Sequence, residues 1–228
     1  MSESITARST QVERSERLVP ALLLGGAVAG PLYLVVGLTE AFTRPGFDIR
    51  RHDLSLLANG PLGWIHIADL VVTGLLVVAG AAGLRASLTT GRGRTWGPLL
   101  VGIFGAGLIG AGFFTADPAL GFPPGTPADV HSVSWHGLMH LVSAAIGFFG
   151  LIAGCLVFAR RFAAGGERVW AACSAVTGVV FLAAFAGIAV GSGNGWAVLG
   201  FWIGVVLAFA WVTAMCLRSL TLATRDTQ

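Results

Sequence analysis

Two pairs of ionisable side chains fall at helical spacing inside apolar stretches of this 228-residue chain. His66 and Asp69 are three residues apart, and His136 and His140 are four residues apart. Either spacing places both side chains on one face of an α-helix. An imidazole beside a carboxylate can accept and return a proton, so these residues predict general acid–base catalysis. Asp117, at the end of another apolar stretch, joins them as a catalytic candidate.

Three interpretations of these side chains stay open. His66, His136 and His140 with a water molecule match a three-histidine zinc site, in which the metal activates the water. A metal-free site would use Asp69 or Asp117, poised by desolvation, with a histidine as partner. The third interpretation is structural: side-chain hydrogen bonds that hold two helices together. Zinc is the one cofactor that the pattern suggests, and nothing in the sequence requires it.

A second group of residues is predicted to bind the substrate. Arg50 and Arg51 lie in a loop where few other cations occur, and they suit an anionic head group or a carboxylate. Neutralisation by neighbouring acidic residues is the alternative role for these two arginines. Glu40, Trp64 and Trp135 complete this predicted substrate-binding set.

Composition indicates what surrounds these residues. Hydrophobic residues make up 55% of the chain and charged residues 11%, and the mean hydropathy is +0.80. A soluble domain carries roughly 25% charged residues, so this polar surface is too small to cover one. We therefore expect lipid to cover the protein, which excludes a soluble protein, a disordered protein and a nucleic-acid-binding protein.

Six apolar runs are long enough to cross a bilayer at about 1.5 Å per residue. Backbone groups that face lipid must be satisfied within their own segment, so each run is predicted to be helical. The predicted fold is all-α and polytopic, with polar tails at 1–17 and 218–228 around a transmembrane domain at 18–217. The predicted spans are 18–42, 62–84, 96–115, 133–158, 169–190 and 196–217.

Arginine placement predicts the orientation. Of the 14 positive residues, all arginine, three fall on one side of the six spans, namely Arg44, Arg50 and Arg51. The other arginines lie on the side that holds both termini. Because positive charge favours the cytoplasmic side, we expect a plasma-membrane protein with both termini in the cytoplasm.

The depth of the polar side chains follows from this orientation. His66 and His136 lie roughly 6–7 Å below the outer surface, and Asp69 and His140 roughly 12 Å below it. Their two helices run in the same direction, so the four groups would converge if the two helical faces met. Ionisable residues at such depths usually face a cavity or a partner.

Several motifs, in order along the chain, resemble the bacterial membrane family catalogued as domain of unknown function 998. The motifs are Arg-Pro-Gly-Phe-Asp-Ile-Arg-Arg-His-Asp-Leu-Ser (44–55), Gly-Pro-Leu-Gly-Trp (60–64), Ala-Asp-Pro-Ala-Leu-Gly-Phe-Pro-Pro-Gly-Thr-Pro (116–127), Ser-Trp-His-Gly-Leu-Met-His (134–140) and Phe-Ala-Arg-Arg-Phe-Ala (158–163). The resemblance covers roughly residues 20–220 and implies a six-helix membrane fold, but no reaction. Members of that family often carry an amide at the positions of His66 and Asp69. The resemblance therefore implies a specialised member in which a shared cavity has acquired an acid–base pair.

We therefore expect a membrane-embedded enzyme that acts on a lipophilic small molecule or lipid from the outer half of the bilayer. Cyclisation, isomerisation and hydrolysis are the reactions that suit the site. One alternative is a non-enzymatic lipid-binding protein or transporter, and another is a structural subunit of a membrane complex. Transport is the less favoured of these functions, because the inner halves of the helices lack the polar residues that a transport path needs. The sequence leaves the oligomeric state open.

Overall fold

The computed structural model describes residues 2–129, 133–191 and 193–225, with the backbone alone for 2–17 and 224–225. Helices are the secondary-structure elements of this part of the chain, apart from an isolated β-bridge between Ala119 and Phe122. The elements are α1 (Ser2–Thr43), η1 (Leu54–Ala58, a 3-10 helix), α2 (Gly63–Ser87), α3 (Trp96–Phe113), α4 (Trp135–Ala164), α5 (Arg168–Gly191) and α6 (Gly195–Arg225).

Each of the six α-helices is long and apolar enough to cross a membrane, which confirms the predicted all-α, six-span fold. Several helices extend beyond the predicted spans. α4 continues to Ala164, because the alanines and arginines after 158 favour a helix until two glycines end it at 165–166. α1 begins at Ser2, so residues 2–17 of the predicted polar tail are helical in backbone.

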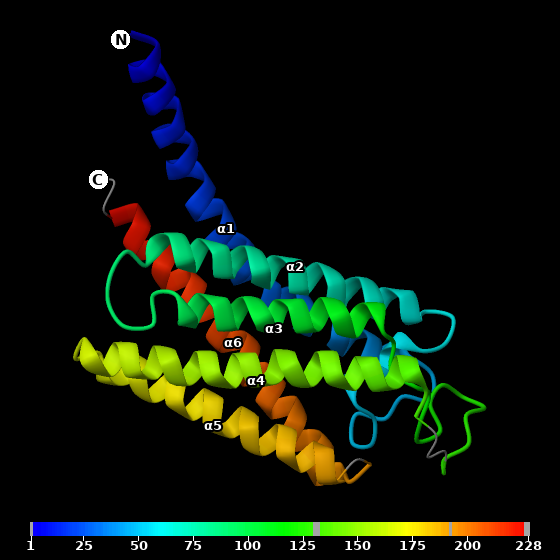
Figure 1. Ribbon diagram of the computed structural model, residues 1–228. Coiled ribbons are helices and arrows are strands. Elements are labelled where there is room, and N and C mark those ends of the chain that lie inside the picture. Colours follow the sequence, from blue (N-terminus) through cyan, green and yellow to red (C-terminus); the bar gives the residue numbers. More distant parts are fainter. Residues whose placement is uncertain (1, 130–132, 192, 226–228) are drawn as a thin grey trace.

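The helices form a ring. Consecutive helices pack against each other from α1 to α6, and α6 packs against α1. The two chain ends lie at the same end of the bundle (Figure 1). We call the opposite end, formed by residues 44–62, 114–129, 133–134 and 193–194, the distal end.

Glycine pairs allow the neighbouring helices to approach closely. A Cβ atom built on Gly107 of α3 would lie 2.5 Å from the Cα atom of Gly147 on α4. A Cβ atom on Gly26 of α1 would lie 2.6 Å from the Cα atom of Gly80 on α2. Such contacts give membrane helices the van der Waals packing that the hydrophobic effect cannot supply in lipid.

The two long distal loops pack on each other and close the bundle at that end. The 44–62 loop tucks η1 inward, with Leu54, Leu56 and Leu57 buried. His52 Nδ1 accepts a hydrogen bond from the Asp48 amide at 2.9 Å, and Nε2 lies 3.2 Å from the Leu120 carbonyl. Phe122 of the second loop is buried against the rings of Phe47 and His52. Both loops therefore form one cover over the helices.

Candidate functional site

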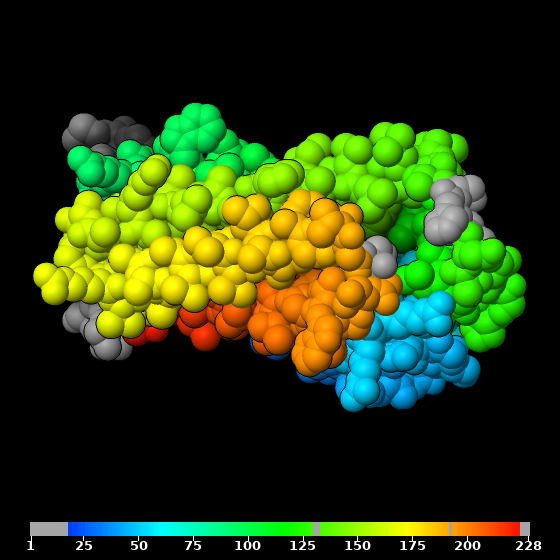
Figure 2. Space-filling model, turned by 90° about the horizontal axis from the view of Figure 1, so that it is seen from below, coloured from blue at the N-terminus to red at the C-terminus, as the bar shows by residue number. Residues whose placement is uncertain are grey.

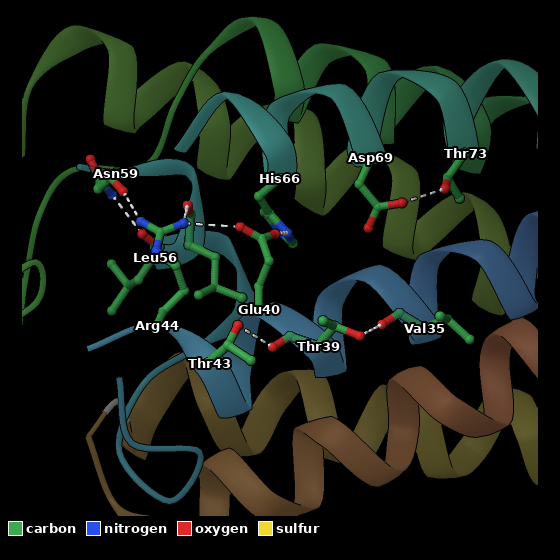
Figure 3. Close-up of polar contacts among 11 residues, drawn as sticks. Val35, Thr39, Glu40, Thr43, Arg44, Leu56, Asn59, His66, Asp69 and Thr73 are labelled. Carbon is green, nitrogen blue, oxygen red and sulfur yellow. Dashed lines mark hydrogen bonds and ion pairs between the residues drawn. The ribbon is translucent and has the colours of Figure 1, made fainter. Parts of the chain in front are cut away.

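Glu40 lies on α1 between two basic side chains, close to the distal end (Figure 3). Its Oε1 atom accepts a hydrogen bond of 2.9 Å from Nη1 of Arg44, one helical turn further on. Its Oε2 atom lies 3.3 Å from Nδ1 of His66 on α2. All three residues are buried, and His66 is completely so. A carboxylate, a guanidinium and an imidazole thus share one water-poor site.

Arg44 is fully engaged by its own chain. Besides Glu40, the guanidinium donates to the carbonyl of Leu57 at 3.2 Å and to that of Asn59 at 2.5 Å. It also lies over the ring of Phe122, 5.6 Å from the centroid. These contacts attach α1 to the distal loops. They leave the Arg44 side chain with a structural role rather than a ligand-binding one.

His66 lacks the hydrogen bonds that a buried imidazole normally makes. Within the described part of the chain, neither of its ring nitrogens has a hydrogen-bond partner, and nor does Oε2 of Glu40. The His66–Glu40 approach is therefore close but poorly aligned. Buried polar atoms are hydrogen-bonded in the great majority of cases, so unpartnered ones call for an explanation such as a ligand or a water.

Asp69 lies one turn further along α2, on the same helical face as His66. Thr73 donates a hydrogen bond of 3.3 Å to its Oδ1 atom, and Oδ2 has no partner among the described residues. The predicted pair of His66 and Asp69 thus shares a buried face, as the spacing indicates. Asp69 is not part of the cavity wall described next.

A cavity of about 500 Å³ occupies the distal half of the ring. All six helices and η1 contribute to its wall. The wall is mostly apolar, and its aromatic side chains come from five helices: Tyr33, Phe104, Phe148, Phe181, Phe185, Phe201 and Phe209, with the last two on α6. The polar side chains of the wall are Tyr33, Asp53, Ser55, His66 and His140. This size and mixture of groups suits a small lipophilic ligand.

The cavity opens on the side of the bundle. Leu141 of α4 lines the cavity although 57% of its surface is exposed, and Ala189 of α5 is also both lining and exposed. Figure 2 shows the surface hollowed where the distal parts of α4 and α5 meet the two distal loops. Both helices are long and apolar enough to cross a membrane, so the opening lies on a face of the bundle that a bilayer would surround.

His140 reaches this cavity, but His136 does not. Nδ1 of His140 lies 2.9 Å from the carbonyl of Ala111 and 2.8 Å from that of Phe114, so its proton is shared between two carbonyls at the end of α3. His136 is exposed and packs against the rings of Trp135 and Phe114.

The predicted convergence of α2 and α4 fails because α3 packs between these two helices. His66 and His140 still line the same cavity, whereas His136 lies on the exposed surface. In the described ranges, no three His, Cys, Asp or Glu side chains lie close enough together to hold a metal ion. The three residues of the predicted zinc site are therefore not assembled there.

Asp117 contacts the N-cap residue of α4 and does not belong to the cavity wall. Its two carboxylate oxygens accept hydrogen bonds from the Ser134 amide at 2.7 Å and from the Ser134 hydroxyl at 2.5 Å. The same hydroxyl accepts from the Gly137 amide at 3.0 Å, which caps the helix. This network gives Asp117 a part in positioning the first turn of α4.

The predicted substrate-binding residues are spread over the distal end. Glu40 is buried beside His66, as described. The remaining four are exposed and do not belong to the cavity wall: Arg50, Arg51, Trp64 and Trp135.

Two ionisable residues of the wall were missed by sequence reasoning. Tyr33 is the one tyrosine of the chain, in the middle of an apolar span, and its ring lies 6.0 Å from that of His66. A single tyrosine within an apolar span could have indicated a site residue. Asp53 belongs to a charged loop, and only the inward turn of η1 brings it to the cavity, so the sequence carried no such signal for it.

Comparison with known proteins places the chain in a family without assigning it a reaction. No curated protein and no solved structure matches it significantly. Residues 27–218 match the family model described as Protein of unknown function (DUF998). That match covers nearly the whole helical ring and agrees with the resemblance of the sequence motifs. The chain therefore belongs to the DUF998 family.

Proposed function

We propose that this protein is a membrane-embedded enzyme that transfers a proton on a lipophilic molecule bound in the cavity, with His66 as the acid–base group. One observation carries the proposal. A fully buried histidine, whose two ring nitrogens have no hydrogen-bond partner among the described residues, lies on the cavity wall beside a buried carboxylate. The chemistry that such a pair supports is proton transfer, because the carboxylate fixes the tautomer and stabilises the imidazolium.

The roles follow from the contacts. Nδ1 of His66 faces Glu40, which leaves Nε2 as the nitrogen available to a ligand. A slight closure would align the Nδ1 proton with Oε2 of Glu40 and place the lone pair on Nε2. Arg44 holds the other oxygen of Glu40 and so keeps this carboxylate oriented. His66 can then take a proton from the substrate and return it.

The wall supplies binding rather than chemistry. His140 has its Nδ1 proton committed to α3, so its Nε2 is a hydrogen-bond acceptor that can orient a polar group of the substrate. The aromatic side chains cover the apolar body and exclude water, which protects a reactive intermediate. Cyclisation and isomerisation need no second substrate, whereas hydrolysis would need a water admitted through the side opening.

Asp69 has a more remote part in this scheme. It is not a wall residue, so we propose that its carboxylate acts on the electrostatics of the cluster and not on the ligand. D69N should then lower turnover less than H66Q does, with the protein still folded. Equal losses for the two variants would give Asp69 the direct role.

The test uses purified protein in nanodiscs, a lipid extract of membranes from the source organism, and deuterated water. Mass spectrometry follows lipids that change in mass or acquire deuterium. Wild-type protein should produce such a change, and H66Q and E40Q should lose it. H136Q removes an exposed histidine outside the cavity and is expected to retain it.

Each outcome separates the candidate functions. Identical lipid profiles with wild-type protein and H66Q would refute catalysis by His66. A lipid that co-purifies with wild-type protein and is recovered unchanged would favour the alternative, a binding protein or carrier. That alternative draws on the side opening of the cavity, which gives a lipid direct access.

A further inference from the structure

The charged groups of the cavity restrict what kind of lipophilic molecule it accepts. Of the described wall residues, Asp53 is the one that carries a formal charge at neutral pH when histidine is counted as neutral. Glu40 and Asp69 lie close behind the wall, and Arg44 balances one of these carboxylates. The lining therefore presents negative charge to a ligand.

The Asp53 carboxylate is free to meet a ligand. Asp53 is the N-cap residue of η1, but its side chain makes no capping hydrogen bond. Its Oδ1 atom is buried and has no hydrogen-bond partner within the described ranges. Burial raises the pKa of Asp53 to about 6, so the carboxylate is still ionised at about pH 7.5.

Among the described residues, no arginine is available to a negatively charged head group in the cavity. The chain contains no lysine, and Arg44 donates to Glu40 and to two backbone carbonyls. Arg50 and Arg51 are exposed and do not line the cavity. A fatty acid or another anionic lipid would thus place its charge beside Asp53 without compensation.

The rest of the wall suits an apolar body and tolerates a cation. Aromatic side chains from α1, α3, α4, α5 and α6 line the cavity. Aromatic rings pack well against apolar groups, and their faces attract ammonium groups within about 6 Å. The volume of about 500 Å³ matches a compact, single-chain or ring-containing molecule.

We propose that the cavity binds a lipophilic amine, with the charged nitrogen at Asp53 and the apolar body among the phenylalanines. The amine reaches the cavity from the membrane through the opening between α4 and α5. This inference rests on the proposed function, since it names the substrate class of the same cavity. It differs from that function in resting on Asp53 and on the side opening, not on His66.

The test compares three probes with one alkyl chain and different head groups: dodecylamine, dodecanol and dodecanoate. Each is titrated into protein in phosphatidylcholine nanodiscs at about pH 7.5, and the melting temperature is followed by tryptophan fluorescence. Dodecylamine should stabilise the wild-type protein most, and dodecanoate should have no effect. D53N should weaken the apparent affinity for dodecylamine by roughly ten- to a hundredfold. D48N changes an exposed carboxylate of the same loop and should leave that affinity unchanged.

A second pair of variants tests the location. Ala189 is exposed and lines the cavity, whereas Ala186, on the same helix, is exposed and does not. A189W should abolish stabilisation by dodecylamine, and A186W should preserve it. If A189W preserves it too, the amine binds elsewhere and the inference is wrong.

The remaining outcomes separate this inference from the proposed function. Equal stabilisation by all three probes, lost in A189W, would overturn the preference for an amine and leave the cavity and His66 in place. No stabilisation by any probe would overturn the inference, and the H66Q comparison would then decide the proposed function independently. Full binding of dodecylamine by D53N would also overturn it.

Discussion

Replacing Arg44 with methionine would leave a buried carboxylate without its partner. Arg44 makes three hydrogen bonds, to Glu40 and to the carbonyls of Leu57 and Asn59, and its exposed fraction is 8%. Methionine keeps much of the apolar stem but makes none of these bonds. Removing one partner of a buried ion pair costs about 3–5 kcal/mol. At about 2–4 °C per kcal/mol for a chain of this length, R44M should lower the melting temperature by roughly 6–20 °C.

The double variant decides whether the cause is the ion pair. E40Q keeps the shape of Glu40 and removes its charge, so we expect a loss of about 1–3 kcal/mol, as for a hydrogen bond to a charged group. In E40Q/R44M no buried charge is left unpaired, and the loss should be smaller than the sum by about 2 kcal/mol or more. Thermal unfolding in one detergent, monitored by tryptophan fluorescence, measures all three variants.

The control is R51M, which removes an exposed arginine of the same loop and should change the melting temperature little. Additive losses in the double variant would refute the argument, because they would show that Glu40 and Arg44 do not stabilise each other. So would an R44M loss no larger than that of R51M.

Three further predictions concern stability. Burial raises the pKa of Asp53 to about 6, so the contribution of Asp53 to stability is largest below about pH 4 and is lost as the pH rises through 6. D53N should therefore be more stable than wild type at about pH 7.5, by at most about 3 kcal/mol, and equally stable near pH 4. Thermal melting at both pH values measures this difference. D117A removes two hydrogen bonds to Ser134, at a cost of about 1–2 kcal/mol. It should lower the melting temperature and raise the rate of amide hydrogen exchange in the first turn of α4. Unchanged exchange would contradict this role of Asp117. G107A should destabilise the protein by about 1–3 kcal/mol, because the added Cβ overpacks against Gly147. The control is G187A, where a Cβ would meet no atom within 4 Å, and it should leave the melting temperature unchanged.

Hydropathy predicted the number and type of the helices but not their ends or their neighbours. The length of an apolar run reports the thickness of the hydrocarbon, and a helix can continue past it into polar sequence. α4 does so as far as Ala164, and α1 begins as early as Ser2. Hydropathy does not depend on which helices are neighbours in the ring. For that reason the sequence could not show that α3 separates α2 from α4.

The candidate site was predictable where it depends on one helix and not where it depends on several. The three-residue spacing of His66 and Asp69 correctly indicated a shared buried face. The four-residue spacing of His136 and His140 was a weaker guide, because His140 meets the end of α3 while His136 remains exposed. The pairing of Glu40 with His66 joins α1 to α2 and depends on their packing.

The other buried histidines show why His66 is the unusual one. His52 uses both ring nitrogens, one toward the Asp48 amide and one toward the Leu120 carbonyl. His140 shares its Nδ1 proton between two carbonyls of α3. Such hydrogen bonds satisfy the ring nitrogens of a buried histidine that has only a structural role, and this chain supplies them at His52 and His140. His66 is as deeply buried, yet it has no such hydrogen bond to any residue that the structure describes. An ionisable residue within a membrane span is costly to retain. A histidine kept there without structural hydrogen bonds is best explained by a group that arrives from outside the chain.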